Sequence, residues 1–181
     1  MKRALLILVI AAVAGVVCWG RFNAVRNDLM AQRESMSAQW SAVDAALGRR
    51  AELLPSLVEA IRRSGRDEAK ALAEIAAARS AFAAARTPQE RIAANDRISA
   101  ALAGLLDRAS EDPKLRESET LDRLQEDIAD AESRIALERR KYNEALEHYN
   151  AQIQRFPDNL VASLSGFTRN DAYFPTEPGA R

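Results

Sequence analysis

Apolar residues recur along most of the chain at alternating steps of three and four, which is the spacing of one face of a helix. The first such face lies between residues 36 and 61, and an arginine interrupts it at position 50; its apolar members are Met36, Trp40, Val43, Leu47, Leu54, Leu57 and Ile61. The pattern predicts a long helix from about Asp28 to Arg63. Ser64-Gly65 supplies its end, because glycine accepts the left-handed conformation that closes many helices.

Three further helices are predicted downstream. Residues 66–85 form an alanine-rich helix. Thr87-Pro88-Gln89-Glu90 then matches a capping box, with proline in the first helical position, and opens a helix that stops near Ser110. Asp112-Pro113 repeats the signal and opens a last helix that ends at Pro157. The apolar face of that helix is expected to contain Leu121, Leu124, Ile128, Ala131, Ile135, Tyr142, Leu146, Tyr149, Ile153 and Phe156.

These elements predict an all-α fold. No stretch alternates apolar and polar residues between turn residues, so no strand is expected. Two long and two shorter helices joined by short turns can bury their faces against one another as an elongated antiparallel four-helix bundle. We expect this bundle at residues 27–167, after a membrane anchor at residues 1–26 and before a C-terminal tail at residues 168–181.

The anchor is expected because residues 4–20, ALLILVIAAVAGVVCWG, carry no charge. A membrane-spanning helix needs about 20 apolar residues and at least about 17, whereas a signal-peptide core has about 7 to 15. A retained single-pass transmembrane helix is therefore favoured over a signal peptide cleaved after Ala12-Val13-Ala14. Cys18 is interpreted as a small apolar residue of that helix rather than a lipidation site. Basic residues on both sides of the span leave both orientations in the membrane open.

Composition and charge narrow the classes of function. The 26 basic and 26 acidic residues cancel and are interleaved, so no basic stripe for nucleic acid is expected. One cysteine and one histidine exclude a disulfide framework within the chain and a zinc site built from several such ligands. His148 is interpreted as a surface residue, and the acid-rich stretch 117–132 as a solvated face because arginines are spaced through it. We expect no catalytic, cofactor-binding or metal-binding residue.

Arg50 is the least usual residue of the first helix, because it occupies a position of the apolar face. A desolvated guanidinium needs acceptors, and Glu132 or Glu138 of the last helix can supply them. Our hypothesis is that one of these pairs fixes the register of the helices. The alternative is that Arg50 reaches solvent. Pro55 cannot donate a hydrogen bond to the carbonyl of Ala51, so a kink is expected there, with Arg50 close enough to donate to the freed carbonyl.

The last helix carries the pairs Tyr142-Asn143 and Tyr149-Asn150, seven residues apart and therefore on one helical face. Tyrosine buries a large ring whose hydroxyl needs a partner, and the adjacent asparagine can bind a neighbouring helix or loop. We interpret the pairs as packing and register residues, with a ligand site as the alternative. The apolar residues of 160–175 are expected to dock on the bundle, with partner binding as the second choice.

Together these features resemble the LemA family of bacterial membrane-anchored helical proteins. The residues that carry the resemblance follow the apolar N-terminal segment: Trp40, Val43-Asp44, Leu47, Arg49-Arg50, Leu54-Pro55-Ser56-Leu57-Val58-Glu59, Glu132-Ser133-Arg134-Ile135, Tyr142-Asn143, Tyr149-Asn150, Phe156-Pro157, Gly166-Phe167 and Tyr173-Phe174. The resemblance implies a long-helix antiparallel bundle anchored in the bacterial inner membrane. It also implies work at membranes with protein partners, since one branch of the family takes part in building magnetosome membranes.

The expected function is that of a membrane-anchored scaffold or adaptor without catalytic activity. Residues 4–20 would hold it in the membrane, and the bundle would present a surface to protein partners that the sequence does not identify. A ligand- or metal-sensing bundle is the alternative, with the acid-rich stretch and the Tyr-Asn pairs as its candidate sites.

Overall fold

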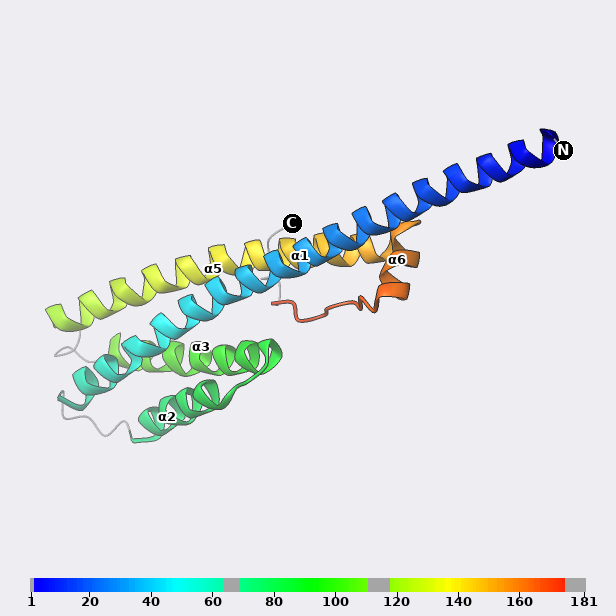
Figure 1. Ribbon diagram of the computed structural model, residues 1–181. Helices are drawn as coiled ribbons and strands as arrows, with labels where there is room; N and C mark the ends of the chain where they lie inside the picture. The colour runs from blue at the N-terminus through cyan, green and yellow to red at the C-terminus, as the bar shows by residue number, and fades with distance from the viewer. Residues whose placement is uncertain (1, 64–68, 111–117, 175–181) are drawn as a thin grey trace. The chain divides into compact units, whose positions relative to one another are not determined.

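The structure, a computed structural model, describes residues 2–63, 69–110 and 118–174. Within these ranges the chain is all-α and contains no strand, which confirms the predicted class. The helices are α1 (Lys2–Arg63), α2 (Ala69–Ala84), α3 (Pro88–Ser110), α5 (Glu119–Gln154) and α6 (Asp158–Ser165) (Figure 1). The predicted stop at Ser64-Gly65 and the predicted start at Asp112-Pro113 lie outside the described residues.

Helix α1 joins two predicted elements into one. Its 62 residues include both the apolar run of residues 4–20 and the helix expected from Asp28 onward, so no helix end separates them. Pro55 lies inside α1, and the helix continues through it to Arg63. The Pro55 ring is exposed. The kink expected there stays a prediction.

The chain divides into two compact units, which are described separately. Unit 1 contains Met1–Ala38 and Glu144–Asp171, and unit 2 contains the described residues of Gln39–Asn143 and Ala172–Arg181. The domain boundaries expected from the sequence, at residues 26 and 167, stay predictions.

In unit 1, the C-terminal part of α5 packs against α1. Val25, Leu29 and Met36 of α1 are buried, as is Leu146 of α5. Gln152 of α5 donates a hydrogen bond from Nε2 to Oδ2 of Asp28 (2.7 Å) and also contacts the side-chain amide of Gln32. The buried apolar face of α1 therefore begins at Val25, before the face predicted from Met36 onward.

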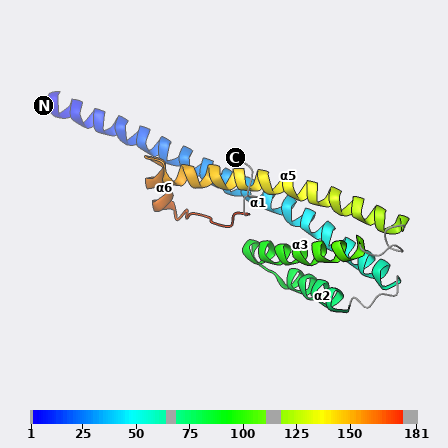
Figure 2. The same cartoon turned by 180° about the vertical axis from the view of Figure 1, so that it is seen from behind.

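In unit 2, apolar faces of α1, α2, α3 and α5 form the core. The face of α1 is buried as predicted at Val43, Leu47, Leu54, Leu57 and Ile61. The other helices contribute a larger set: Ala71, Ile75, Ala78, Phe82, Ile92, Ile98, Leu102, Leu105, Leu121, Leu124, Ile128, Ile135 and Tyr142. Helices α2 and α3 lie side by side (Figures 1 and 2), and successive helices of this unit run in opposite directions (Figure 1).

The capping box predicted before α3 is confirmed. The backbone N–H of Glu90 donates to Oγ1 of Thr87 (3.2 Å), while the Glu90 carboxylate accepts from the backbone N–H groups of Arg86 (2.7 Å) and Thr87 (3.2 Å). These two backbone hydrogen bonds lower the pKa of Glu90. Arg91 joins the cap to the core: its guanidinium lies 4.4 Å from the centre of the Phe82 ring and donates to the Phe82 carbonyl oxygen (2.8 Å).

The end of the last long helix differs from the prediction. Helix α5 stops at Gln154, and Phe156, expected on the buried face, is 75% exposed. The chain turns at Pro157 and forms α6, which ends at Gly166 in the left-handed conformation (φ 74°). The N–H of Phe167 then donates to the Ala162 carbonyl oxygen (2.9 Å), which closes α6 in the way that favours glycine.

Docking of this C-terminal segment is partial. Ala162 is buried, but Leu160 is 55% and Leu164 79% exposed. Both had been expected to dock on the bundle. The physical reason is the geometry of the helix: Leu160 and Leu164 are each two residues from Ala162, about 200° around α6, so they project from the side opposite the buried one.

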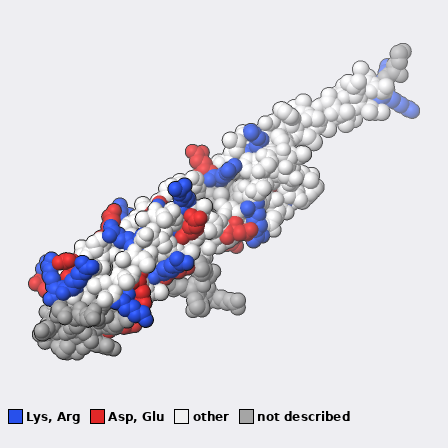
Figure 3. Space-filling model, turned by 90° about the horizontal axis from the view of Figure 1, so that it is seen from below, with Lys and Arg blue, Asp and Glu red and all other residues white. Residues whose placement is uncertain are grey.

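The N-terminal stretch of α1 is apolar and exposed. Large apolar side chains between Leu5 and Trp19 are all more than half exposed. In Figure 3 this stretch is white, with basic side chains only at its tip. Within the described residues, α1 is the one helix that is long and apolar enough to cross a membrane.

Candidate functional site

A buried polar cluster lies in unit 2 around Arg50. Arg50 is 3% exposed, and its guanidinium binds two residues of α3. Nη1 donates to Oγ of Ser99 (3.0 Å), and Nη2 donates to the backbone oxygen of Asn95 (3.2 Å) and to its side-chain oxygen. Asn95 is itself 2% exposed. The cluster therefore joins α1 to α3 through charge-assisted hydrogen bonds within the core.

Glu132 of α5 forms an ion pair with this cluster. One carboxylate oxygen lies 3.7 Å from Nη1 of Arg50, which is an ion pair beyond hydrogen-bonding distance, and the Glu132 side chain is 52% exposed. Burial lowers the pKa of Arg50, and the Glu132 carboxylate acts in the opposite direction. Because solvent screens a half-exposed acid, the hydrogen bonds to α3 contribute more to holding Arg50.

Of the two acids that the hypothesis offered, Glu132 is the one paired with Arg50. The Oε1 atom of Glu138 lies 3.1 Å from Nζ of Lys141, one turn along the same helix. The hypothesis did not name Asn95 and Ser99, which accept the hydrogen bonds of Arg50. A signal for them existed, because Ile92, Asn95, Ser99, Leu102 and Leu106 follow steps of three and four, so polar residues take two positions of that face.

The first Tyr-Asn pair holds the C-terminal segment within unit 2. Asn143 donates from Nδ2 to the backbone oxygen of Phe174 (3.0 Å) and accepts from its N–H (3.0 Å). The side-chain amide thus imitates the two-bond pairing of neighbouring strands. Beside it, the rings of Tyr142 and Phe174 lie edge to face with Trp40 against both, and the Arg139 guanidinium lies 4.7 Å from the centre of the Phe174 ring. Burial raises the pKa of Tyr142 to about 12.

The second pair makes the same kind of contact within unit 1. Asn150 donates from Nδ2 to the backbone oxygen of Asn170 (2.6 Å) and accepts from its N–H (3.0 Å). The Tyr149 hydroxyl donates to the backbone oxygen of Thr168 (2.9 Å). Burial raises the pKa of Tyr149, while Arg33 acts in the opposite direction. Both pairs therefore bind backbone of the chain's own extended segment.

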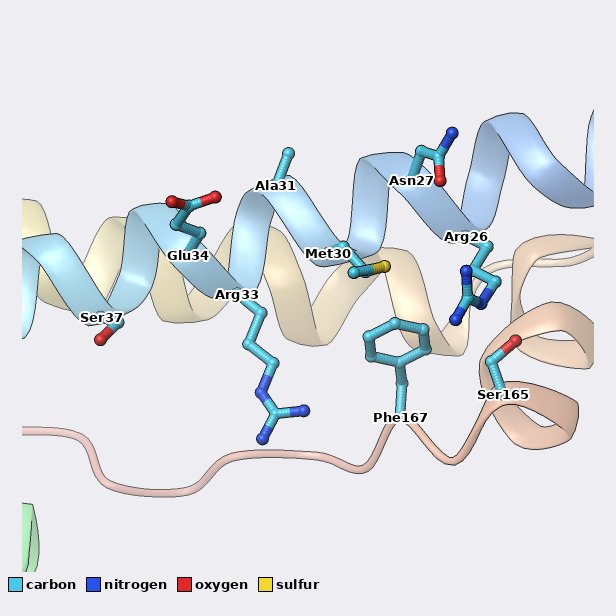
Figure 4. A pocket seen from close by; sticks show the side chains of 9 residues that line it. All are labelled: Arg26, Asn27, Met30, Ala31, Arg33, Glu34, Ser37, Ser165 and Phe167. Atoms are coloured by element: carbon cyan, nitrogen blue, oxygen red, sulfur yellow. The ribbon is translucent and has the colours of Figure 1, made fainter.

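An open groove of about 770 Å³ lies in unit 1 between α1 and the chain around Phe167. In Figure 4 the Phe167 ring and the Met30 side chain approach each other, and the side chains of Arg26 and Arg33 lie on either side of them. The groove thus combines an apolar centre with two cationic side chains. Such a surface suits a ligand or peptide with apolar and acidic groups.

Titratable groups elsewhere form no cluster within the described ranges. No group of three or more His, Cys, Asp or Glu side chains there is arranged to hold a metal ion. His148 is exposed and lies near Gln32 and Ser35 of α1. In the acid-rich stretch, Glu119 pairs with Arg123 one turn later (2.5 Å), as the spacing of acids and arginines predicts.

Over the described residues this is an all-α chain whose first helix is long and apolar enough to span a membrane and whose tail is held by paired tyrosines and asparagines. The LemA family profile matches residues 39–181, which is more than half of the chain, so the protein belongs to the LemA family. The predicted family is thereby confirmed.

Two curated relatives are similar over a shorter region. They are magnetosome protein MamQ 2 and magnetosome protein MamQ 1 of Paramagnetospirillum magneticum, each 32% identical over 78 residues. The aligned region covers 43% of this chain and 28% of each relative. The chain therefore matches little more than a quarter of the length of either protein.

Proposed function

We propose that this LemA family protein is a membrane-anchored, non-enzymatic scaffold that presents a helical surface to protein partners. The observation that carries the proposal is the continuity of α1. The exposed apolar run and the buried face that begins at Val25 belong to one helix, so insertion of the first part would hold the second part at the membrane.

The arrangement of the packed part is proposed as an elongated antiparallel four-helix bundle. The alternating directions of the helices in unit 2 and their continuous buried faces support this arrangement. Arg50 is proposed to fix its register, because Asn95 and Ser99 accept its hydrogen bonds in one alignment of α1 and α3 only.

The groove between Arg26 and Arg33 is the proposed partner surface. Its apolar centre at Met30 and Phe167 would receive an apolar side chain, and the two guanidinium groups would pair with acids on either side. The partner expected is a protein segment with acidic residues around an apolar one. The similarity to two magnetosome proteins, together with the magnetosome branch of the family, supports membrane organisation as the process.

Anchoring is tested by flotation of the full chain with membranes after extraction at alkaline pH. The wild-type chain is expected to float with the membrane fraction. A variant with Leu8→Arg and Val13→Arg should be released, since each arginine at the centre of a span costs about 2.5–3.5 kcal/mol for insertion. Release of the wild-type chain by the same treatment contradicts anchoring by α1.

Partner binding is tested by a photo-crosslinking amino acid at Met30 in native membranes, with identification of the products by mass spectrometry. Ser35 is the matched control, because it is an exposed residue of the same helix outside the groove. Crosslinks to one protein from Met30 and none from Ser35 are expected, and Arg26→Glu with Arg33→Glu should abolish them. Equal crosslinking from both positions contradicts a role for the groove.

A further inference from the structure

We infer that α6 lies in the surface of the membrane, with Phe156, Leu160 and Leu164 inserted among the lipids. The inference rests on the proposed anchoring by α1 and adds a second membrane contact from the other end of the chain. It concerns unit 1 only, to which both segments belong.

The ion pair between Arg21 and Asp158 fixes the depth of α6 relative to the membrane. Arg21 is the first charged residue after the uncharged run of residues 4–20, and its Nη2 lies 3.8 Å from Oδ1 of Asp158, the first residue of α6. If residues 4–20 span the hydrocarbon, Arg21 lies where the headgroups begin. Helix α6 then begins at the same depth.

Aromatic side chains mark the same level. Trp19 is 70% exposed, and its ring is stacked on that of Phe22 with the centres 6.3 Å apart. Tryptophan prefers the boundary between lipid and water, where its ring is apolar and its N–H can reach polar groups. Figure 1 shows α6 running across the direction of α1 rather than along it. A helix that crosses a spanning helix at this level lies along the membrane surface.

The exposed side of α6 has the chemistry of a lipid contact. Leu160 and Leu164 are four residues apart in α6, so their side chains project from one side of the helix, and Phe156 is exposed in the turn that precedes it. Ala162, on the other side, is buried against the rest of unit 1. An interfacial helix buries its apolar side about 5–10 Å into the boundary between headgroups and acyl chains.

Membrane fits this surface better than a protein does. A standard protein interface buries about 800 Å² on each partner, which three isolated side chains cannot supply. Helix α6, with the sequence DNLVASLS, contains no lysine or arginine, and its one acid is paired with Arg21. Insertion should therefore depend on apolar contact and not on anionic headgroups.

The experiment measures the depth of single positions in the full chain, reconstituted in phosphatidylcholine vesicles. Cys18, the sole cysteine of the chain, is replaced in Cys18→Ser, and a cysteine for an environment-sensitive fluorophore is then introduced at one site. The sites are Leu164→Cys for α6, Val9→Cys for the span and His148→Cys as the control. His148 lies near Gln32 and Ser35, which follow Arg21 by roughly 16–21 Å of helix.

Lipids that carry a nitroxide near the headgroup quench a fluorophore at the membrane surface, and lipids that carry it deep in the acyl chain quench a fluorophore near the centre of the bilayer. We expect loss of fluorescence at position 164 with the shallow quencher, at position 9 with the deep one, and at position 148 with neither. The emission of position 164 should also lie at shorter wavelength than that of position 148. Replacing part of the lipid by phosphatidylglycerol should leave these values unchanged.

The outcomes separate this inference from the proposed anchoring. Quenching at position 9 but not at 164 overturns the inference and leaves the anchor intact, whereas no quenching at either position overturns both. A fluorophore at 164 that is protected from aqueous iodide without quenching by lipid indicates that a second copy of the chain covers it and overturns the lipid contact. Quenching only with phosphatidylglycerol present overturns apolar insertion. Leu160→Cys provides a second position if Leu164→Cys lowers the helix content measured by circular dichroism.

Discussion

Replacing Arg50 by methionine tests whether the buried cluster stabilises the fold through α3. Arg50→Met keeps an unbranched side chain in the core but removes every donor of the guanidinium. Asn95 is then left with a side-chain oxygen and a backbone oxygen that have lost a buried donor. We expect the free energy of unfolding to fall by about 2–4 kcal/mol.

The magnitude follows from the geometry of the three acceptors. A buried polar group that loses its hydrogen bond costs about 1–3 kcal/mol, and Asn95 is fully inside the core. Ser99 is only partly buried, so water can replace Arg50 there. The ion pair with the half-exposed Glu132 adds about 0–1 kcal/mol after screening by solvent. Most of the loss should therefore depend on Asn95.

The assay is urea unfolding of the full chain in mild detergent, followed by circular dichroism at the helical band. Arg49→Met is the matched control, because Arg49 is the exposed neighbour on the same helix, and it should change stability by no more than about 0.5 kcal/mol. Arg50→Lys should lose nearly as much as Arg50→Met, since an ammonium group cannot reach the separated acceptors as a planar guanidinium does.

A double-mutant cycle with Asn95→Leu gives the decisive result. Once both side chains are apolar, neither leaves a buried donor or acceptor without its partner in the pair, so the double variant should lose about 1–3 kcal/mol less than the sum of the single variants. Additive losses would refute the reasoning. A loss in Arg50→Met equal to that in Arg49→Met would do so as well.

Three further predictions concern other contacts. Because burial raises the pKa of Tyr142 from 10 to about 12, the unfolded chain loses this proton first as pH rises. Stability of the wild type should then fall by about 2 kcal/mol more than that of Tyr142→Phe between pH 10 and 12 in thermal melts, and parallel profiles would contradict this. Asn143→Ala should speed hydrogen exchange of the Phe174 amide roughly 5- to 100-fold by NMR, and unchanged exchange would show that this contact does not hold the segment. Thr87→Ala should cost about 1 kcal/mol in urea unfolding through loss of the cap on Glu90, whereas an unchanged midpoint would rule out the cap as a source of stability.

The helical class and several helix ends could be predicted because local rules determine them. The steps of three and four identified the buried face of α1, and the residues Thr87 to Glu90 located the start of α3. The prediction that Phe156 lies on a buried face was wrong. The spacing of apolar residues continues in the sequence beyond Gln154, although α5 ends there. The spacing of apolar residues within one helix does not show where the chain turns away from the helix against which it packs.

The polar contacts were harder to predict, because they depend on which helices meet. The apolar pattern placed Arg50 on the buried face but left open that it reaches solvent, and the structure shows it buried. Its partners depend on how α1 aligns with two other helices, so the sequence could not select Asn95 and Ser99. The sequence predicted that Asn143 and Asn150 bind a neighbouring helix or loop. That the segment would be the extended chain before and at Phe174 was visible only in the structure.

The buried guanidinium also bears on the order in which the protein folds. A cation that leaves water before its acceptors arrive is strongly disfavoured, and arginine cannot avoid this by losing its proton at neutral pH. The layer of α1 around Arg50 can therefore become dry only when α3 brings Asn95 and Ser99 into place. If α1 packed against α5 alone during hydrophobic collapse, water would remain around Arg50 in this part of the core. The last water to leave the core during folding, and the first to return during unfolding, should accordingly be found next to Arg50.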